Sequence, residues 1–155
     1  MKRRSAREYA LQFLYRIGFL EVAESPESLR SALAAFWADA KEEDHDVRSF
    51  AENIIEGTIR HLAELDDEIQ RAADKWDIGR MASVDRTILR MAGYELLKRP
   101  DIPAAVSINE ALEIAKKYST GDSAAFINGI LDRIARDVEG TRKAPKKPLQ
   151  TQSES

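Results

Sequence analysis

Residues 84–133 constrain the fold more than any other stretch of the chain, because they divide into three helical segments with distinct ends. Apolar residues recur in each segment at the spacing of an amphipathic helix. The letters R-P-D-I-P interrupt the pattern once, since proline ends a helix, and a glycine interrupts it again at position 121. The pattern predicts three helices here and requires no β-strand.

Local signals indicate where these three helices begin and end. Ser83 is a plausible N-cap for the first helix. Ser107 and Glu110 have the spacing of a capping box that would open the second. We interpret Gly121 as the C-terminal stop of the second helix and Asp122 as the N-cap of the third.

The first half of the chain also has a helical pattern. We expect one helix over residues 4–20, and a second after Ser25 and Pro26, which form a strong N-terminal signal. Apolar residues from 47 to 69 then predict a single long helix of about 25 residues, or about 38 Å. Gly57 lies inside it, and we expect a close helix crossing there. The segment K-W-D-I-G-R-M should pack between the two halves.

Composition places the chain among ordinary globular proteins. Hydrophobic residues make up 43% of its 155 positions and charged residues 33%, a typical balance. No apolar run is long enough to span a bilayer, and no signal-peptide core follows the charged start, so we expect a cytoplasmic protein without a membrane partner. The absence of cysteine suits a reducing compartment. The Pro-rich, basic end is typical of a disordered tail.

The residues needed for catalysis are largely missing. His45 and His61 have no ligand partner at helical spacing, and the chain has no Gly-rich phosphate loop and no G-x-S-x-G motif. Paired acids elsewhere are common on solvated helix surfaces. We therefore expect no catalytic residues, no metal, no cofactor and no enzymatic activity.

The basic opening of the chain favours binding of a polyanion. Arg3, Arg4 and Arg7 fall with Tyr15 on one arc of the first helix, beside its apolar stripe. Arginine binds phosphate in a bidentate way and stacks on bases, and tyrosine adds a ring and a hydroxyl. Cations at a helix N-terminus oppose the helix dipole, which favours a functional reason for them. The alternative is a solvated basic helix start, which is frequent.

Polar residues near the last three helices could form a second edge of the same groove. Arg86 and Arg90 either extend the basic surface or pair with acids such as Asp85 and Glu95. Tyr118 ends the second of these helices and Asp122 follows closely. Each of these residues alone has a simple structural explanation. Only their closeness to one another favours a second edge of the groove.

Four ordered motifs at matching spacing resemble the NusB family of transcription antitermination factors. They are R-R-S-A-R-E-Y-A-L-Q-F-L-Y at 3–15, V-D-R-T-I-L-R-M-A-G-Y-E-L at 84–96, D-I-P-A-A-V-S-I-N-E-A-L-E-I-A-K-K-Y at 101–118 and D-S-A-A-F-I-N-G-I-L-D at 122–132. The resemblance covers nearly all of residues 3–132 and is weakest over 22–46. Ser5 departs from the family pattern, in which a further arginine is frequent.

The resemblance implies an all-α fold of two small three-helix bundles that share an interface, followed by a disordered C-terminal tail. The expected RNA-binding domain covers residues 1–140, with an N-terminal lobe over about 1–75 and a C-terminal lobe over about 76–140. Residues 141–155 would form the disordered basic tail.

The same resemblance implies binding to the boxA element of nascent ribosomal RNA transcripts, together with NusE, a small-subunit ribosomal protein, within an RNA polymerase antitermination complex. It marks six positions for RNA contact: Arg3, Arg4, Arg7, Arg90, Tyr118 and Asp122. It marks Tyr15 and Asp85 for contact with NusE. The chain could act as a monomer or a homodimer.

Two other functions stay open from the sequence. One is a helical protein–protein adaptor without specific RNA binding, which the N-terminal arginines argue against. The other is a stand-alone relative of the RNA-binding domain of rRNA cytosine methyltransferases, although this chain is too short to hold the catalytic domain.

Overall fold

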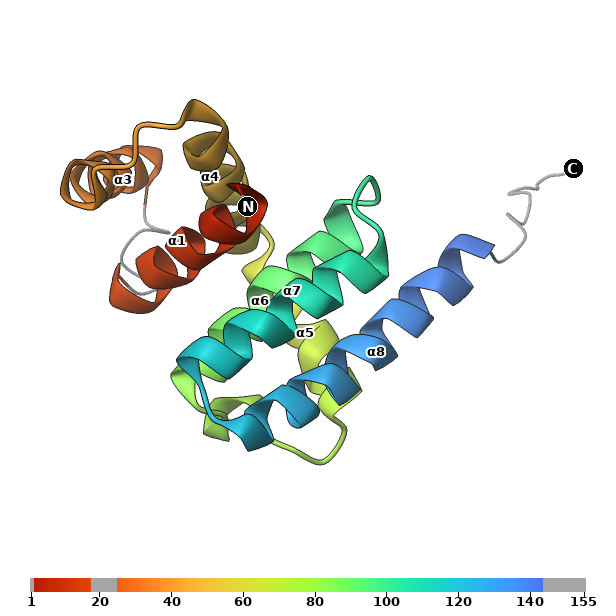
Figure 1. Cartoon of the computed structure of the whole chain (residues 1–155). Coiled ribbons are helices and arrows are strands. Elements are labelled where there is room, and N and C mark those ends of the chain that lie inside the picture. The colour runs from red at the N-terminus through yellow and green to blue at the C-terminus, as the bar shows by residue number, and fades with distance from the viewer. Residues whose placement is uncertain (1, 18–24, 144–155) are drawn as a thin grey trace, which may run out of the picture.

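A computed structural model describes residues 2–17 and 25–143, and within these ranges it consists of helices joined by turns and loops, with no β-strand (Figure 1). The predicted all-α class is thereby confirmed. The predicted end of the first helix at residue 20 and the tail from 144 onward lie outside the described residues. The helices are α1 (Lys2–Ile17), α3 (Pro26–Ala40), α4 (His45–Arg60), α5 (Leu62–Ala73), the 3₁₀ helix η1 (Ile78–Arg80), α6 (Ser83–Lys98), α7 (Ala104–Tyr118) and α8 (Gly121–Lys143).

The first bundle consists of α1, α3 and α4. Helix α1 packs along α4, while α3 is attached by an aromatic cluster in which Phe36 makes edge-to-face contacts with Tyr9, Phe13 and Trp37. Such ring pairs add to the free energy of area burial. The predicted N-cap of α3 is confirmed, since Ser25 Oγ accepts from the backbone N–H of Ser28 at 3.0 Å.

The single long helix expected over 47–69 is wrong, because the chain turns at His61 between α4 and α5. The apolar stripe continues across the turn, but its two halves face different neighbours. Helix α4 packs on α1, whereas α5 buries Leu65 and Ile69 against α6 and α8. Hydrophobic periodicity records which positions are buried and carries no information about a change of axis between them.

The second bundle contains α5, α6, α7 and α8, with α6 buried at its centre. Helix α6 also contacts α1 and α4, so the two bundles share an interface, as expected. Tyr94 of α6 closes on Gly57 of α4, where an added Cβ would lie 2.1 Å from the Tyr94 Cζ. This confirms the close crossing predicted at Gly57.

Several predicted helix ends are wrong by a few residues. The N-cap of α6 is Ala82, and Ser83 is already helical. Helix α7 begins directly after Pro103, so Ser107 lies in its second turn and forms no capping box with Glu110.

The start and end of α8 also differ from the prediction. Gly121 opens this helix, and Thr120 occupies the cap, its Oγ1 accepting from the Ser123 N–H at 3.3 Å. Asp122 is therefore a first-turn residue and no cap. Helix α8 continues to Lys143, so residues 141–143 are helical, contrary to the expected tail. Among the described helices, none has the length and apolar character that a bilayer span requires.

Candidate nucleic-acid interface

Arg7 has a structural position that the sequence did not reveal. Its side chain is buried, with the residue 3% exposed, and its Nε and Nη2 donate to Glu95 Oε2 and Oε1 at 2.7 and 2.8 Å. Ser107 Oγ donates to the same carboxylate at 2.7 Å. Arg7 thus joins α1 to α6 inside the protein, and this burial does not favour a direct contact with RNA.

Arg4 lies one helical turn before Arg7 and at the surface. Its Nε and Nη2 donate to the two carboxylate oxygens of Glu110 on α7, both at 2.7 Å. This bidentate ion pair lowers the pKa of Glu110 below its ordinary value, chiefly through the hydrogen bonds from Arg4. The guanidinium stays partly exposed, so its outer edge remains available to an anion.

Arg3 is exposed and differs from both neighbours. Its guanidinium carbon lies 4.6 Å from the centre of the Phe50 ring on α4, a cation–π contact. Within the described part of the chain it forms no ion pair. Asp101, whose pKa is lowered chiefly by hydrogen bonds from Arg99, also interacts electrostatically with Arg3.

Tyr118 ends α7 beside the middle of α1. Its hydroxyl donates to Glu8 Oε1 at 2.8 Å and accepts from Gln12 Nε2 at 3.2 Å. Partial burial, followed by the contact with Glu8, raises the pKa of Tyr118. Lys117 donates to the same Glu8 oxygen at 2.8 Å. The phenol is protonated at neutral pH and its orientation is fixed.

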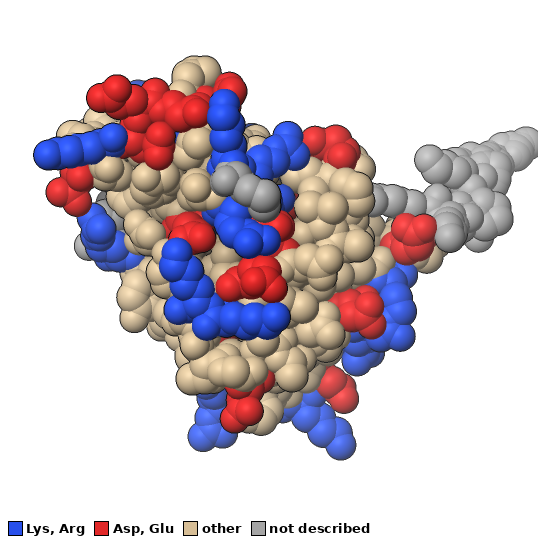
Figure 2. Space-filling view, viewed as in Figure 1, with Lys and Arg blue, Asp and Glu red and all other residues tan. Residues whose placement is uncertain are grey.

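These residues form a continuous strip between α1 and α7, which we call the α1–α7 edge. Figure 2 shows basic side chains gathered around the start of α1, with acidic and basic groups alternating below them. Acidic side chains also gather over the region of α3 and α4. The α1–α7 edge is defined by Arg3, Arg4, Glu8, Glu110, Lys117 and Tyr118.

Arg90 lies apart from the α1–α7 edge and beside Tyr15. Its Nε and Nη2 donate to Asp66 of α5 at 2.7 and 2.8 Å. Both Arg90 and Tyr15 line a hollow of about 590 Å³ between α1, α5 and α6. Tyr15 is 56% exposed. The structure therefore brings Arg90 to the residue expected to face NusE and away from the N-terminal arginines.

Asp85 is buried in the first turn of α6. It accepts from Ser119 Oγ at 2.6 Å and from Ser123 Oγ at 2.7 Å, and so holds the junction between α7 and α8. The neighbouring Arg86 donates to backbone carbonyls, the closest being Ile78 at 3.2 Å, and does not extend a basic surface. Direct contact between the Asp85 carboxylate and a partner is not favoured by this burial.

Asp122 is exposed at the start of α8 and lines a hollow of about 270 Å³ with Trp76 and Phe126. The two aromatic rings lie 5.5 Å apart, and Trp76 is 55% exposed. This pair could not be predicted from the sequence, because the segment that contains Trp76 was expected to pack between the two halves of the chain. Phe126 directly precedes the buried Ile127. Only the fold shows that Trp76, in the linker between α5 and η1, contacts the Phe126 ring.

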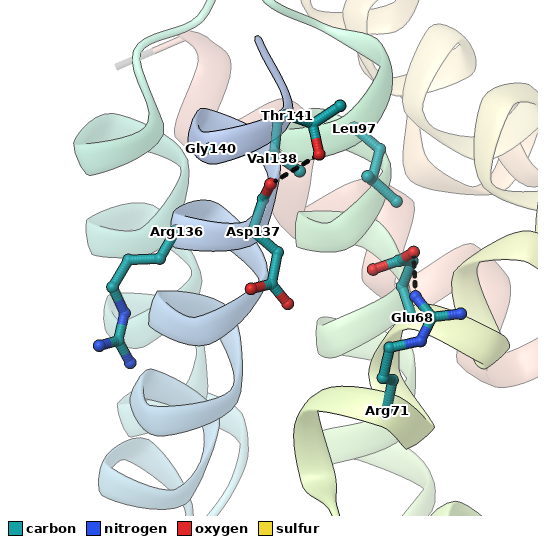
Figure 3. A pocket seen from close by; sticks show the side chains of 8 residues that line it. All are labelled: Glu68, Arg71, Leu97, Arg136, Asp137, Val138, Gly140 and Thr141. Atoms are coloured by element: carbon teal, nitrogen blue, oxygen red, sulfur yellow. Dashed lines mark hydrogen bonds and ion pairs between the residues drawn. The ribbon is translucent and has the colours of Figure 1, made fainter. Parts of the chain in front are cut away.

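A hollow of about 810 Å³ between α5 and α8 contains none of the predicted site residues (Figure 3). Glu68 and Arg71 of α5 form an ion pair on one side, and Arg136 and Asp137 of α8 lie on the other. Opposite charges alternate around it. Over residues 2–17 and 25–143, no cluster of three or more potential metal ligands is present.

A family model described as NusB matches residues 4–136. The transcription antitermination protein NusB of Thermodesulfovibrio yellowstonii is 51% identical, over 95% of this chain and all of that protein. The protein of the same name from Geobacter sulfurreducens is 49% identical, over 86% of this chain and 93% of its own length.

Solved structures show the same fold. T. maritima NusB superposes with a TM-score of 0.75 at 38% identity, covering 96% of this chain and 97% of that one. A NusB in a crystal structure with NusE and double-stranded RNA has a TM-score of 0.75 at 24% identity, covering 88% and 97%. At that identity the second likeness establishes the fold alone.

Proposed function

The chain belongs to the NusB family, and on this premise we propose that it is a transcription antitermination factor that binds boxA RNA of nascent ribosomal RNA transcripts together with NusE. The observation that carries the proposal is the 51% identity to a transcription antitermination protein NusB across the full length of that protein. The four sequence motifs indicate the same family.

The α1–α7 edge is the RNA-binding surface in this proposal. Arg3 and the outer edge of Arg4 bind phosphates, since guanidinium groups recognise phosphate in a bidentate way. Tyr118, oriented by Glu8, offers a fixed ring and hydroxyl to an unstacked base. Asp122 and the aromatic pair of Trp76 and Phe126 extend the surface at the start of α8.

NusE binds a different face in this proposal. Tyr15 is a large exposed side chain at the rim of the hollow that it shares with Arg90. Aromatic and arginine side chains are enriched where interfaces bind most strongly. Asp85 supports that face indirectly by fixing the α7–α8 junction. The complex then joins the RNA polymerase antitermination complex in the cytoplasm, and a homodimer of the free protein is compatible with it.

The protein acts as a scaffold in this proposal and carries out no reaction. Its task is to hold one RNA segment and one protein in a fixed relation. Basic contacts supply most of the affinity, which should therefore fall as salt rises.

Fluorescence anisotropy with a boxA RNA and a scrambled RNA of equal length tests the RNA function. We expect tighter binding to boxA, strengthened by NusE, and a several-fold loss in Arg4→Gln because a phosphate-binding cation is removed. Arg136→Gln is the matched control, since Arg136 is exposed on α8 and forms an ion pair with Asp132 of the same helix. Equal weak binding to both RNAs, unaffected by NusE, would identify a helical adaptor instead.

Tyr15→Asp tests the proposed NusE face. Because the ring is largely exposed, we expect the melting temperature to stay near that of the wild type while NusE binding weakens at least tenfold, as at a central interface aromatic. Calorimetric titration with NusE measures the second quantity. A large fall in melting temperature together with unchanged NusE affinity contradicts the assignment.

A further inference from the structure

The linker between α5 and η1 carries Trp76, whose ring is 55% exposed. The ring of Phe126 on α8 lies 5.5 Å away, with the two ring planes at 60° to each other. A side chain on a surface linker is ordinarily free to change its position. Whether Trp76 offers a fixed binding surface therefore depends on how the linker is held.

Gln70, in the last turn of α5, holds the linker through its side-chain amide. Its Nε2 donates to the backbone carbonyl of Trp76 at 2.7 Å, and its Oε1 accepts from the backbone N–H of Ile78 at 2.9 Å. A longer contact joins Nε2 to the backbone carbonyl of Asp74 at 3.5 Å. Because an amide can both donate and accept, this one side chain fixes the main chain on both sides of Trp76.

Two further features leave the linker little freedom. Asp74 has φ 60° and ψ −110°, and residues other than glycine rarely adopt a positive φ. Such a conformation persists only where the surrounding contacts enforce it. After Trp76, Asp77 Oδ1 accepts from the Gly79 N–H at 2.9 Å, and Arg86 donates to the Ile78 carbonyl at 3.2 Å, which attaches η1 to α6. The linker is thus held at both ends.

The hollow of about 270 Å³ beside Trp76 suits a base better than a phosphate. Its lining contains one cation, Arg80, and two carboxylates, Asp85 and Asp122, so the local charge does not favour the phosphate backbone of a nucleic acid. The rings of Trp76 and Phe126 instead provide aromatic surface, on which any base can stack.

We infer that Gln70 is a positioning residue, which holds Trp76 beside Phe126 as a preformed stacking site for one unpaired RNA base. The inference rests on the proposed function for the presence of RNA. It adds a residue that lies outside the proposed RNA-binding surface and acts on that surface through the linker. Because the Trp76 ring is already fixed, RNA binding does not have to order it.

Fluorescence anisotropy with the boxA and scrambled RNAs tests this site. Trp76→Ala removes the stacking ring and should weaken binding about fivefold or more, whereas Trp76→Phe keeps a ring and should retain most of the affinity. Gln70→Met has a similar length and no charge but removes the hydrogen bonds to the linker, so it should weaken binding several-fold. Thermal melting establishes that each variant is folded, and Gln70→Asn, which is too short to reach the linker, replaces Gln70→Met if the latter is not.

The double variant with Gln70→Met and Trp76→Ala shows whether Gln70 acts through Trp76. If it does, the double variant binds RNA as tightly as Trp76→Ala alone, because the ring that Gln70 positions is already gone. A further loss equal to that caused by Gln70→Met in the wild type overturns the positioning role. Unchanged affinity in Trp76→Ala overturns the stacking site.

Quenching of tryptophan fluorescence by acrylamide provides a readout other than affinity. The chain has two tryptophans, and the neutral quencher reaches the exposed Trp76 far more readily than the buried Trp37. Saturating RNA should protect Trp76 from acrylamide in the wild type, and should protect it less in Gln70→Met. Equal quenching of the wild type with and without RNA contradicts the inference.

The scrambled RNA separates this inference from the proposed function. Base stacking tolerates any sequence, so the effects of Trp76→Ala and Gln70→Met should appear with both RNAs. If the wild type shows no preference for boxA and no response to NusE, the proposed function fails, while these effects still support the stacking site. If the preference and the response are present but Trp76→Ala binds like the wild type, the proposed function stands and the inference fails.

Discussion

Three arginines within five positions have three different environments. Arg3 lies on an aromatic ring, Arg4 shares a surface ion pair, and Arg7 is buried against Glu95. The sequence showed that the cluster lies beside the apolar stripe of α1. It could not show which arginine the partner helices cover, because Glu95 and Ser107 come from positions far along the chain. The sequence alone therefore cannot show whether an arginine at the margin of an apolar stripe is buried or exposed. That depends on which helix packs against it.

The Arg7→Ala variant should lose stability first and RNA binding only as a consequence. Removing the guanidinium leaves the Glu95 carboxylate buried, with Ser107 as its remaining donor. Breaking a buried pair in this way costs about 3–5 kcal/mol. Urea denaturation measures the difference, with Arg4→Ala as the exposed control. If both variants unfold at the same urea concentration, the structural role of Arg7 is wrong.

At the scale of elements, most of the helices were predictable, whereas several of their ends and the turn between α4 and α5 were not. Ser25 caps α3 as its sequence indicates, because the signal is local. The turn at His61 escaped prediction because both α4 and α5 continue one apolar stripe. Ser107 looked like a cap, yet it serves as a donor to Glu95. A polar residue with a distant partner can imitate a local signal.

Two helical glycines, Gly57 at the crossing of α4 and α6 and Gly129 on α8, should respond to substitution in opposite ways. In Gly57→Ala the new methyl group would overlap the buried Tyr94 ring, and overpacking of this kind costs about 1–3 kcal/mol. Gly129 of α8 has no atoms within 4 Å of an added Cβ, so Gly129→Ala should raise stability by up to about 1 kcal/mol. Urea denaturation of both variants checks the contrast. A stabilised Gly57→Ala would mean that the ring moves aside freely.

For the whole molecule, the α1–α7 edge links the two bundles through ion pairs. Arg4 and Glu8 belong to α1, whereas Glu110 and Lys117 belong to α7. The family and the general fold followed from the sequence motifs, since these record helices and their order. The motifs could not show that Tyr15 and Arg90 line the same hollow, because this depends on how α1 lies across α6. The pairing of Trp76 with Phe126 depends on the fold in the same way.

The Arg4–Glu110 pair should make stability depend on pH in the acid range. Arg4 lowers the pKa of Glu110 below its ordinary value of 4.5, so the unfolded state binds the proton first. The stabilisation is complete above that ordinary value and is lost as the pH falls through the lower folded value. Glu110→Gln should therefore differ most from the wild type near neutral pH, and the two should converge in acid. Urea denaturation across that range tests this, and a constant difference would contradict it.

The ion pairs of the α1–α7 edge also set a condition on any RNA that binds there. Arg4 and Lys117 already form ion pairs with carboxylates of the same protein. An incoming strand therefore has to compete with these carboxylates. A poorly matched polyanion gains too little binding free energy to displace these carboxylates. A strand with several well-placed phosphates and bases gains enough. The internal ion pairs therefore lower the affinity for non-specific nucleic acid. The net charge of −3 acts in the same direction.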